Sequence, residues 1–461
     1  MARAMPSPSS MRLTFDRGTL LIVGSPTPAL AHTIPGALWD PRVRAYRCPA
    51  HLVESVRAAL AASGVPFSDE VSARRMAAPG CRTSIDIRPY QRAAITAWDL
   101  AGRRGVVALP TGSGKTRMAI AVIAETAVST LCLVPTRVLL EQWIRVVREL
   151  TGYEPGVFGD GERTLRPITV ATFESAWRNM DVIGDRFGLL IVDEAHHFGS
   201  GIRDEALEMS TASLRLGLSA TPPTSGAGER LASLLGPAVY ELSVRDLAGT
   251  FLAPFDEIVI HVDLDPVERR EYFQLTNTFR DAMTRFRRFH PHASWDDFVR
   301  AAGQTDDGRR AIAAFYRTRK LLAYPTAKRI ALARLLSLHR QARTLVFVAD
   351  NETAYAVARE HLIMPLTCDI GRKERERALF LFREGQLRAL VSAQVLNEGL
   401  DVPDAEVGIV VAGRCGEREH IQRIGRLLRP SVGKRALVYE LVARNTREVR
   451  EGERRRKAIA A

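Results

Sequence analysis

The stretch GVVALPTGSGKT, residues 105–116, decides the fold class of this chain. Its apolar first half is typical of a buried strand, a loop with two glycines follows, and a helical pattern begins at Lys115. A strand that passes through a tight loop into a helix is the repeating unit of α/β sheets. The stretch therefore predicts an α/β fold, with this loop at the carboxyl end of a parallel strand.

The same unit recurs along the chain, first up to residue 218 and again after residue 343. Each instance is a short run rich in Val, Ile and Leu, followed by a polar cluster and a helical segment. The further runs are TLCLV, ITVA, LLIV and LGL in the first set, and TLVFV, RALV and EVGIVV in the second. We therefore expect two parallel sheets, with each polar cluster at the strand ends where such sheets bind ligands.

The loop in the opening stretch has the composition of a phosphate-binding site. Its backbone N–H groups and the dipole of the following helix would hold phosphate oxygens. Lys115, counted here as catalytic, would reach the β- and γ-phosphates, and the Thr116 hydroxyl would ligate Mg²⁺. The strict motif has glycine where Leu109 stands, but the strand, loop and helix context still favours ATP and Mg²⁺ as ligands. The loop residues are Thr111, Gly112, Ser113 and Gly114.

A second polar cluster follows the strand in LLIVDEAHHFG, residues 189–199. Two carboxylates after a strand buried on both faces are costly unless a cation lies beside them. Mg²⁺ near Lys115 would be that cation, so we expect Asp193, on the neighbouring strand end, to hold the ion through water. Glu194 would orient and deprotonate the attacking water. The alternative is a solvated strand end, and the phosphate loop argues against it.

A third cluster, IQRIGRLLRP at residues 421–430, has an arginine every three residues. A solvated basic helix is one explanation. Gly425 in mid-helix costs about 1 kcal/mol relative to alanine, which favours close approach to another surface instead. We expect Arg426 and Arg429 to be catalytic, delivering guanidinium groups to a γ-phosphate across a cleft. Hydrolysis would then depend on domain closure.

Composition narrows the class of partner. The 461 residues carry a formal net charge of +13, which favours a polyanion, with nucleic acid ahead of a membrane surface. The five cysteines show no CxxC spacing, so neither a zinc ribbon nor a disulfide framework is indicated, and a reducing cytoplasm fits. The run TLLIVGSPTPALA, residues 19–31, resembles a secretory segment, but its prolines favour a strand and a turn. We expect no membrane partner.

Eight motifs between Arg88 and Pro430 together resemble superfamily 2 helicases of the DEAH-signature type. They are RPYQ, LPTGSGKT, VPTRVLLEQW, VATFES, VDEAHH, GLSATPP, LNEGLDVPD and QRIGRLLRP. The similarity is closest to the XPB family, especially its archaeal members, through LVSAQVLNEGLDVPDAEVGIVVAG and the following REHIQRIGRLLRPSVGK. The resemblance implies two RecA-like motor domains that close on MgATP.

Several residue roles follow only from this resemblance, and for each hydroxyl or amide a helix cap or turn is the alternative. Arg88 and Gln91 would recognise adenine. His196, Gly399, Asp401 and Gln422 would line the nucleotide cleft. Ser219 and Thr221 would couple hydrolysis to domain movement. Contacts to the nucleic-acid backbone would come from Thr136, Arg137 and Thr172.

The resemblance also divides the chain. We expect a disordered N-terminus at 1–10, an α+β damage-recognition-like domain at 11–80, RecA-like domains at 81–264 and 329–450, a helical thumb-like insertion at 265–328, and a basic tail at 451–461 that belongs to a solvated helix. In the thumb, Arg285, Arg287 and Arg288 would contact phosphates beside a stacking surface of Phe279, Phe286 and Phe289. The alternative is an amphipathic helix whose Phe residues form a local core.

We therefore expect an ATP-dependent DNA helicase or duplex translocase acting on duplex or forked DNA, in repair or transcription-linked remodelling, with a possible nuclease partner. XPB proteins carry an Arg-Glu-Asp element, associated with duplex opening, where this chain has TSGAGER, residues 224–230. This difference favours translocation over strand separation. Two alternatives stay open: an RNA-stimulated ATPase of similar architecture, and an ATP-gated DNA-binding module that does not move.

Overall fold

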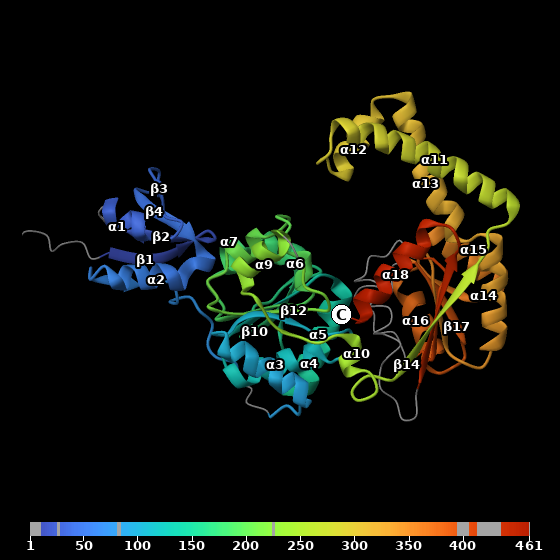
Figure 1. Cartoon of the computed structure of the whole chain (residues 1–461). Helices are drawn as coiled ribbons and strands as arrows, with labels where there is room; N and C mark the ends of the chain where they lie inside the picture. Colours follow the sequence, from blue (N-terminus) through green and yellow to red (C-terminus); the bar gives the residue numbers. More distant parts are fainter. Residues whose placement is uncertain are drawn as a thin grey trace, which may run out of the picture. The chain divides into compact units, whose positions relative to one another are not determined.

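The computed structural model describes residues 11–24, 28–80, 84–223, 226–393, 405–412 and 435–460. The chain divides into two compact units, with the boundary between Leu242 and Ser243. The first unit holds the N-terminal domain, drawn in blue in Figure 1, and a larger sheet domain in cyan and green. The second holds another sheet domain and a helical arm. The two predicted sheet domains are confirmed.

The N-terminal domain is a five-stranded sheet in the order β3-β4-β2-β1-β5 with two helices. Strands β1 and β2 pair antiparallel and form a hairpin, so the predicted strand at the start of residues 19–31 is present. Helix α2 ends at Ala62, and Gly64 follows with a φ of +69°, a left-handed conformation that glycine adopts without strain. The elements are β1 (Met11–Asp16), β2 (Thr19–Val23), α1 (Pro28–Thr33), β3 (Leu38–Asp40), β4 (Ala45–Pro49), α2 (Val53–Ala62) and β5 (Phe67–Asp69).

The first motor sheet has eight strands in the order β13-β6-β12-β11-β7-β10-β8-β9, and within it only β9 pairs antiparallel among the described residues. Its strands are β6 (Arg104–Ala108), β7 (Thr130–Val134), β8 (Gly156–Gly159), β9 (Glu162–Arg163), β10 (Ile168–Thr172), β11 (Leu189–Val192), β12 (Leu214–Ser219) and β13 (Ala238–Glu241). Its helices are α3 (Pro89–Leu100), α4 (Lys115–Thr126), α5 (Arg137–Thr151), α6 (Phe173–Trp177), α7 (Met180–Ile183), α8 (Glu205–Glu208) and α9 (Gly226–Leu235).

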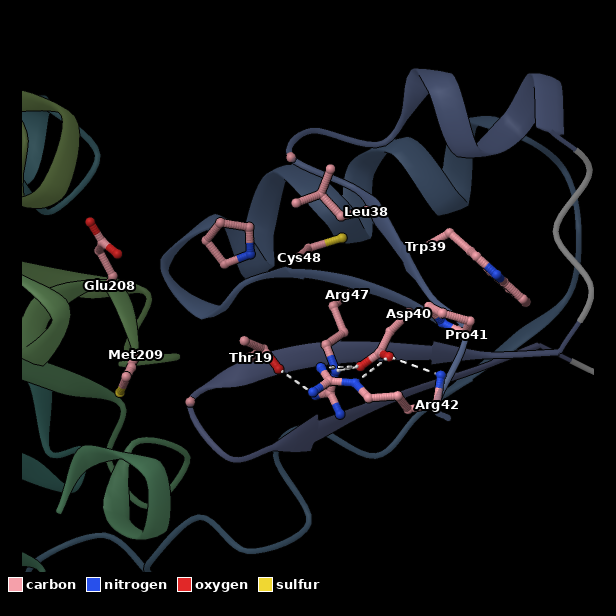
Figure 2. Close-up of a pocket in the computed structure, with 13 residues that line it drawn as sticks. Thr19, Leu38, Trp39, Asp40, Pro41, Arg42, Arg47, Cys48, Glu208 and Met209 are labelled. Carbon is pink, nitrogen blue, oxygen red and sulfur yellow. Dashed lines mark hydrogen bonds and ion pairs between the residues drawn. The ribbon is translucent and has the colours of Figure 1, made fainter. Parts of the chain in front are cut away.

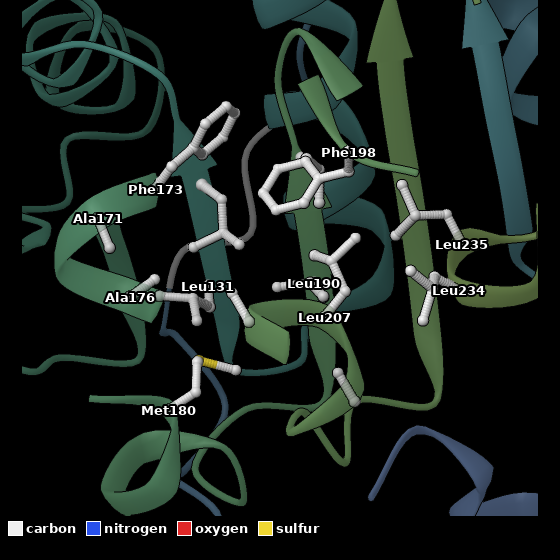
Figure 3. Packing of buried hydrophobic residues seen from close by; sticks show 14 of the residues in the cluster. Leu131, Ala171, Phe173, Ala176, Met180, Leu190, Phe198, Leu207, Leu234 and Leu235 are labelled. Atoms are coloured by element: carbon white, nitrogen blue, oxygen red, sulfur yellow. The ribbon is translucent and has the colours of Figure 1, made fainter. Parts of the chain in front are cut away.

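One face of this sheet carries a dense apolar core. Side chains of β7 and β11 pack there against α6, α7, α8 and α9, as Figure 3 shows for Leu131, Leu190, Ala176, Met180 and Leu207. All of these side chains are buried. The helices therefore cover the apolar runs that the sequence predicted as β7 and β11. The polar residues that follow these strands lie at the carboxyl edge of the sheet.

The second unit contains a six-stranded sheet in the order β14-β19-β18-β15-β17-β16, in which the described strands pair parallel. The strands are β14 (Phe255–Val262), β15 (Thr344–Phe347), β16 (Met364–Leu366), β17 (Ala389–Ser392), β18 (Val407–Val410) and β19 (Ala436–Ala443). The helices are α10 (Val244–Leu247), α11 (Pro266–Phe289), α12 (Trp295–Gly303), α13 (Asp306–Ala323), α14 (Thr326–Leu338), α15 (Asn351–His361), α16 (Arg372–Arg383) and α18 (Arg447–Ala460).

Two predicted boundaries are wrong. The first motor domain was expected to extend to residue 264, but β14 pairs along its whole length with β19 of the second sheet. The strand follows the first domain in sequence, so sequence order alone assigned it to the wrong sheet. The basic tail was set apart at residue 451 and expected to be a solvated helix. The helix is present as α18, which begins at Arg447, but the predicted solvation is wrong at Arg455, which is 7% exposed and donates two hydrogen bonds to the buried Glu440 of β19.

The predicted helical insertion is confirmed as α11, α12 and α13, which project from the second sheet as an arm (Figure 1). A buried ion pair lies near the base of this arm, in α14. Lys328 is fully buried and donates a hydrogen bond of 2.7 Å to Glu448 of α18. Burial lowers the pKa of Lys328, and Glu448 opposes that shift. The pair ties α14 to α18.

Replacing Lys328 with methionine is expected to destabilise the second unit by about 3–5 kcal/mol, because Glu448 would keep a nearly buried charge without its partner. Urea denaturation of the full chain measures the loss as a shift of the transition midpoint. Lys320→Met is the matched control, since Lys320 and Glu352 form an exposed pair, 2.8 Å long, that contributes at most about 1 kcal/mol. Equal shifts for the two variants would contradict the prediction.

Candidate nucleotide and nucleic-acid site

The loop after β6 has the backbone geometry of a phosphate cradle. Gly112 and Gly114 have φ values of +84° and +80°, and α4 begins directly after Gly114. A Cβ on Gly114 would lie 2.7 Å from Nε2 of Gln91, so this position requires glycine for space as well as for conformation. The Thr111 hydroxyl oxygen is buried and has no hydrogen-bond partner among the described residues. An oxygen-rich ligand at this loop would satisfy it.

Lys115 and Thr116 open α4, as the sequence predicted. The Lys115 side chain is 9% exposed, and its Nζ donates to the carbonyl oxygens of Leu109 at 2.9 Å and Pro110 at 3.3 Å. Its positive charge opposes the rise that burial causes in the pKa of Asp193, so the ammonium group lies near this carboxylate.

Gln91 braces the loop from α3. It is 2% exposed, its Nε2 donates to the carbonyls of Ser113 at 2.8 Å and Gly114 at 3.1 Å, and its Oε1 accepts from the Arg88 N–H at 2.8 Å. Tyr90 adds a hydrogen bond of 2.5 Å from its hydroxyl to the Ser113 carbonyl. The described contacts of Gln91 are thus with the loop and with Arg88, and its implied role in adenine recognition stays a prediction.

Asp193 and Glu194 lie at the carboxyl edge of the same sheet. The sequence placed Asp193 on the strand next to the phosphate loop, and this is wrong, because β12 lies between β6 and β11. Asp193 is 5% exposed, and burial raises its pKa, while Lys115 and the Trp143 indole oppose that shift. Its Oδ2 accepts from Nε1 of Trp143 at 2.8 Å, and its Oδ1 accepts from the Glu194 N–H at 3.0 Å.

Glu194 begins a short contact chain across the strand ends. Its φ of +50° is a left-handed conformation that is strained for a residue with a side chain. Its Oε2 lies 3.4 Å from Nδ1 of His196, and the same nitrogen lies 3.3 Å from the Ser219 hydroxyl at the end of β12. Ser219 Oγ also accepts from the Thr221 N–H at 3.1 Å. The predicted base and the two predicted coupling residues are therefore in one connected group.

The residues implied to contact nucleic acid follow β7 and β10, two adjacent strands. The Thr136 hydroxyl accepts from Leu139 N–H and caps α5, and the Thr172 hydroxyl accepts from Ser175 N–H and caps α6. Helix capping, the stated alternative, is thus present at both. Arg137 is exposed and forms an ion pair of 2.7 Å with Asp160. The nucleic-acid role of these three residues stays a prediction.

The predicted residues of the second motor domain lie outside the described residues. They are Gly399, Asp401, Gln422, Arg426 and Arg429. Their roles therefore stay predictions from the sequence. The acids and the phosphate loop, in contrast, are assembled entirely within the first unit.

The helical arm contains the local core of the alternative interpretation, and its phosphate contacts stay a prediction. Phe279 and Phe286 contact Phe298, with ring centroids 6.0 and 5.3 Å apart, so they form a local core. Phe289 is 77% exposed, and a stacking role is open only to this phenylalanine of the three. The three arginines predicted to contact phosphates are exposed: Arg285, Arg287 and Arg288.

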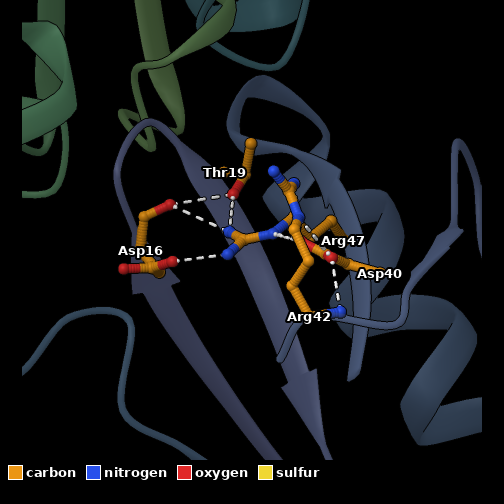
Figure 4. Close-up of polar contacts among 5 residues, drawn as sticks. All are labelled: Asp16, Thr19, Asp40, Arg42 and Arg47. Atoms are coloured by element: carbon orange, nitrogen blue, oxygen red, sulfur yellow. Dashed lines mark hydrogen bonds and ion pairs between the residues drawn. The ribbon is translucent and has the colours of Figure 1, made fainter. Parts of the chain in front are cut away.

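The N-terminal domain holds a pocket of about 490 Å³ whose lining also includes Glu208 and Met209 of the first sheet domain (Figure 2). Its polar wall is an ion-pair network in which Asp40 accepts hydrogen bonds from Arg42 and Arg47 (Figure 4). These two guanidinium groups hold the pKa of the Asp40 carboxyl well below its usual value. Arg47 also bonds to Asp16 of the adjacent hairpin. The network fixes the shape of this wall.

Sequence reasoning missed two residues that contact the site. Tyr90 bonds to the phosphate loop and Trp143 to Asp193. Trp143 stands seven residues after Thr136, a spacing of about two helical turns that places both on one face of α5. That spacing was the signal, but an apolar helix face is usually part of a core, so it did not indicate a contact with the acids.

Three family models match the chain. They are described as "Xeroderma pigmentosum group B helicase damage recognition domain" over residues 13–71, "Type III restriction enzyme, res subunit" over 84–224, and "Helicase conserved C-terminal domain" over 327–431. Their order along the chain is that of the N-terminal domain and the two sheets. No described helix combines the length and apolar character needed to cross a bilayer.

Two solved structures show the same fold. The Hef helicase domain of Pyrococcus furiosus matches 80% of this chain and 98% of its own, with a TM-score of 0.53 and 19% identity. Dbp5 of S. cerevisiae, bound to RNA and ADP BeF3, matches 81% of this chain and 88% of its own, with a TM-score of 0.54 and 16% identity. At such identities these likenesses concern the fold alone.

Sequence relatives are more specific. The chain is 33% identical over 426 residues to the DNA 3'-5' translocase XPB2 of Sulfurisphaera tokodaii, covering 92% of this chain and 96% of that protein. It is 29% identical to the DNA 3'-5' helicase XPB of Mycobacterium tuberculosis, over 81% of this chain and 64% of that longer protein. Because the first match extends over nearly the whole of both proteins, and the damage-recognition model also matches, this chain belongs to the XPB family of superfamily 2 helicases and translocases.

Proposed function

We propose that this chain is an ATP-dependent DNA translocase or helicase that hydrolyses MgATP at a cleft between its two motor domains. The observation that carries this proposal is the group at one sheet edge of the first unit. This group consists of a glycine-formed loop, Lys115 and the two acids Asp193 and Glu194. The chain that carries it is 33% identical to a named DNA translocase. The DEAH-type label, from Asp193 to His196, is part of this proposal.

Phosphate binding rests on backbone donors and one ammonium group. The loop N–H groups and the start of α4 would hold the β- and γ-phosphate oxygens. On binding, Lys115 Nζ would exchange its two carbonyl acceptors for phosphate oxygens. This exchange is favourable because a charged acceptor forms a stronger hydrogen bond than a carbonyl.

Glu194 would act as the general base. It would accept a proton from the water that attacks the γ-phosphate, and the nearby His196 would orient its carboxylate. Ser219 and Thr221, at the end of β12, would couple this proton transfer to domain movement. Ser219 contacts the same histidine, and Thr221 donates its N–H to Ser219. Arg426 and Arg429 would stabilise the charge on the transferred phosphoryl group.

Mg²⁺ is the metal that this chemistry requires, and the donors present fit it. Thr116 supplies a hydroxyl at the start of α4, and Asp193 supplies a carboxylate whose two oxygens are already oriented by N–H donors. Both are hard oxygen ligands of the kind Mg²⁺ prefers. When bound, the ion would neutralise charge on the β- and γ-phosphates.

DNA is the proposed polymer, because the chain is strongly basic and its relatives are named DNA enzymes. Positive charge on Arg285, Arg287 and Arg288 would hold phosphates with little sequence preference. The N-terminal domain would recognise a distorted or forked structure. A role in DNA repair or transcription-linked remodelling, a nuclease partner and a cytoplasmic location belong to the same proposal.

A panel of nucleic-acid cofactors tests this function. ATP hydrolysis by the full chain is expected to be stimulated most by duplex DNA, less by single strands and least by RNA. In a triplex assay the chain is expected to displace the third strand only with ATP, because translocation pushes the strand off the duplex. Strongest turnover on RNA would favour an RNA-stimulated ATPase. Stimulation without displacement would favour an ATP-gated DNA-binding module.

A further inference from the structure

The metal-holding carboxylate receives a hydrogen bond from a helix outside the acidic motif. Nε1 of Trp143 donates to Oδ2 of Asp193 at 2.8 Å, and the Glu194 N–H donates to Oδ1 at 3.0 Å. Each oxygen therefore has one fixed donor, and the carboxylate cannot rotate without breaking a bond. The indole is fully buried and Asp193 is 5% exposed, so water does not readily replace the lost donor.

Trp143 belongs to α5, the helix that starts at the predicted nucleic-acid contacts. Thr136 caps this helix directly after β7, and Arg137 is its first residue. Seven residues of α-helix separate Thr136 from Trp143, a distance of about 10 Å along one rigid element. Trp143 shares its buried face with Leu139, Leu140 and Val147, which anchor the helix on the sheet domain. A displacement of the first turn of α5 would therefore also move the indole of Trp143.

We propose that Trp143 is a positioning residue that ties the Asp193 carboxylate to α5, so that a DNA strand held at the start of this helix sets the geometry of the metal-holding group. In this proposal Trp143 acts through Asp193, to which its indole N–H donates. This inference rests on the proposed function, because it takes the first turn of α5 as a DNA contact. It supplies a physical route by which DNA stimulates hydrolysis.

Trp143→Phe tests the inference, since it keeps an aromatic ring and removes the N–H. The first measurement is binding of a fluorescent ATP analogue that is not hydrolysed, titrated with Mg²⁺ and without DNA. We expect half-saturation to need roughly 10- to 100-fold more Mg²⁺, the usual effect of losing an outer-shell partner of a metal ligand. Binding of the analogue in the presence of a chelator should be unchanged, because the phosphate loop is intact.

The second measurement is the linkage between DNA and the Mg²⁺-bound analogue. In the natural chain, duplex DNA is expected to tighten analogue binding, and the analogue must then tighten DNA binding by the same factor. In Trp143→Phe both factors should fall toward one, while the affinity for DNA alone stays within about twofold of the natural chain, because no predicted DNA contact is changed.

Trp98→Phe is the matched control. Trp98 is also buried in the first unit, and its Nε1 donates to the Arg215 carbonyl at the same distance of 2.8 Å. The same substitution there costs a buried hydrogen bond of equal length, so it reproduces any loss of stability. We expect it to leave the Mg²⁺ requirement and the linkage unchanged. Thermal unfolding of both variants checks that each remains folded.

The outcomes separate this inference from the proposed function. An unchanged Mg²⁺ requirement in Trp143→Phe, or an equal change in Trp98→Phe, would overturn the positioning role even if the natural chain translocates on DNA. A raised requirement together with an undiminished DNA linkage would overturn the route through α5. If the natural chain shows no linkage with DNA at all, the proposed DNA function fails, whereas a raised Mg²⁺ requirement would still support the tie between Trp143 and Asp193.

Discussion

Glu194→Gln is expected to lower ATP turnover by at least about 100-fold while nucleotide binding stays largely intact. The substitution keeps the size of the side chain, but it removes the negative charge and the ability to take a proton, and it replaces one acceptor oxygen with an amide donor. Nucleotide binding is retained because the phosphate loop and Lys115 are on β6 and α4, separate from Glu194. Single-turnover hydrolysis at saturating DNA, together with binding of a fluorescent ATP analogue, measures both effects.

Glu162→Gln is the control for this experiment. Glu162 is an exposed acid on β9 in the same sheet domain, so the variant carries an identical change of charge away from the site. Its turnover should equal that of the natural chain. If Glu194→Gln retained more than a few per cent of the rate, Glu194 would not be the base, and its left-handed conformation would need a structural explanation.

The fold of this chain follows closely from its sequence, because parallel strands covered on both faces leave an unusually clear pattern. Runs such as LLIV, residues 189–192, are apolar throughout, and charged residues that are costly to bury follow them. The signal fails where pairing is not local. Strand β14 follows the first sheet in sequence but pairs with β19, nearly two hundred residues later, and no short-range pattern encodes that partner.

The candidate site could be predicted in its residues but only partly in its contacts. Lys115, Asp193 and Glu194 were predicted because their types and spacing have few uses other than phosphate and metal chemistry. Strand β12 was predicted as the run LGL, but its position between β6 and β11 was not, since strand order is a tertiary property. The contacts of Trp143 and Gln91 were not predicted either. Trp143 lies on an apolar helix face and bonds to Asp193, and Gln91 braces the phosphate loop through Ser113. Both contacts arise only when separate helices pack together.

The solvated character predicted for the tail failed for a related reason. Arginine-rich sequence normally marks an exposed surface, yet Arg455 and Arg456 both pair with Glu440, a carboxylate that is 1% exposed on β19. The acid lies in an otherwise apolar strand, and its charge requires partners from elsewhere in the chain. A single acidic residue inside the run ALVYELVA, residues 436–443, was the available signal.

Arg426→Ala is expected to reduce turnover by roughly 10³-fold or more, the effect of removing a guanidinium group that stabilises the transferred phosphoryl group. Arg426 lies outside the described residues, so the expectation comes from the QRIGRLLRP motif and from Gly425, which permits close approach to another surface. Single-turnover hydrolysis at saturating ATP and DNA isolates this contribution, because binding defects are then overcome.

The competing explanation, a basic surface helix, predicts a different outcome. A surface arginine that contacts phosphates contributes to DNA affinity and to its salt dependence, so its loss is compensated by more DNA or less salt. Arg454→Ala is the control, because it removes an exposed arginine of α18, and its turnover at saturating DNA should equal that of the natural chain. If Arg426→Ala also regained full turnover at high DNA concentration, the arginine would be a surface contact. A deficit that persists at every DNA concentration and falls on the rate of the chemical step would identify it as the group from the second domain that completes the site.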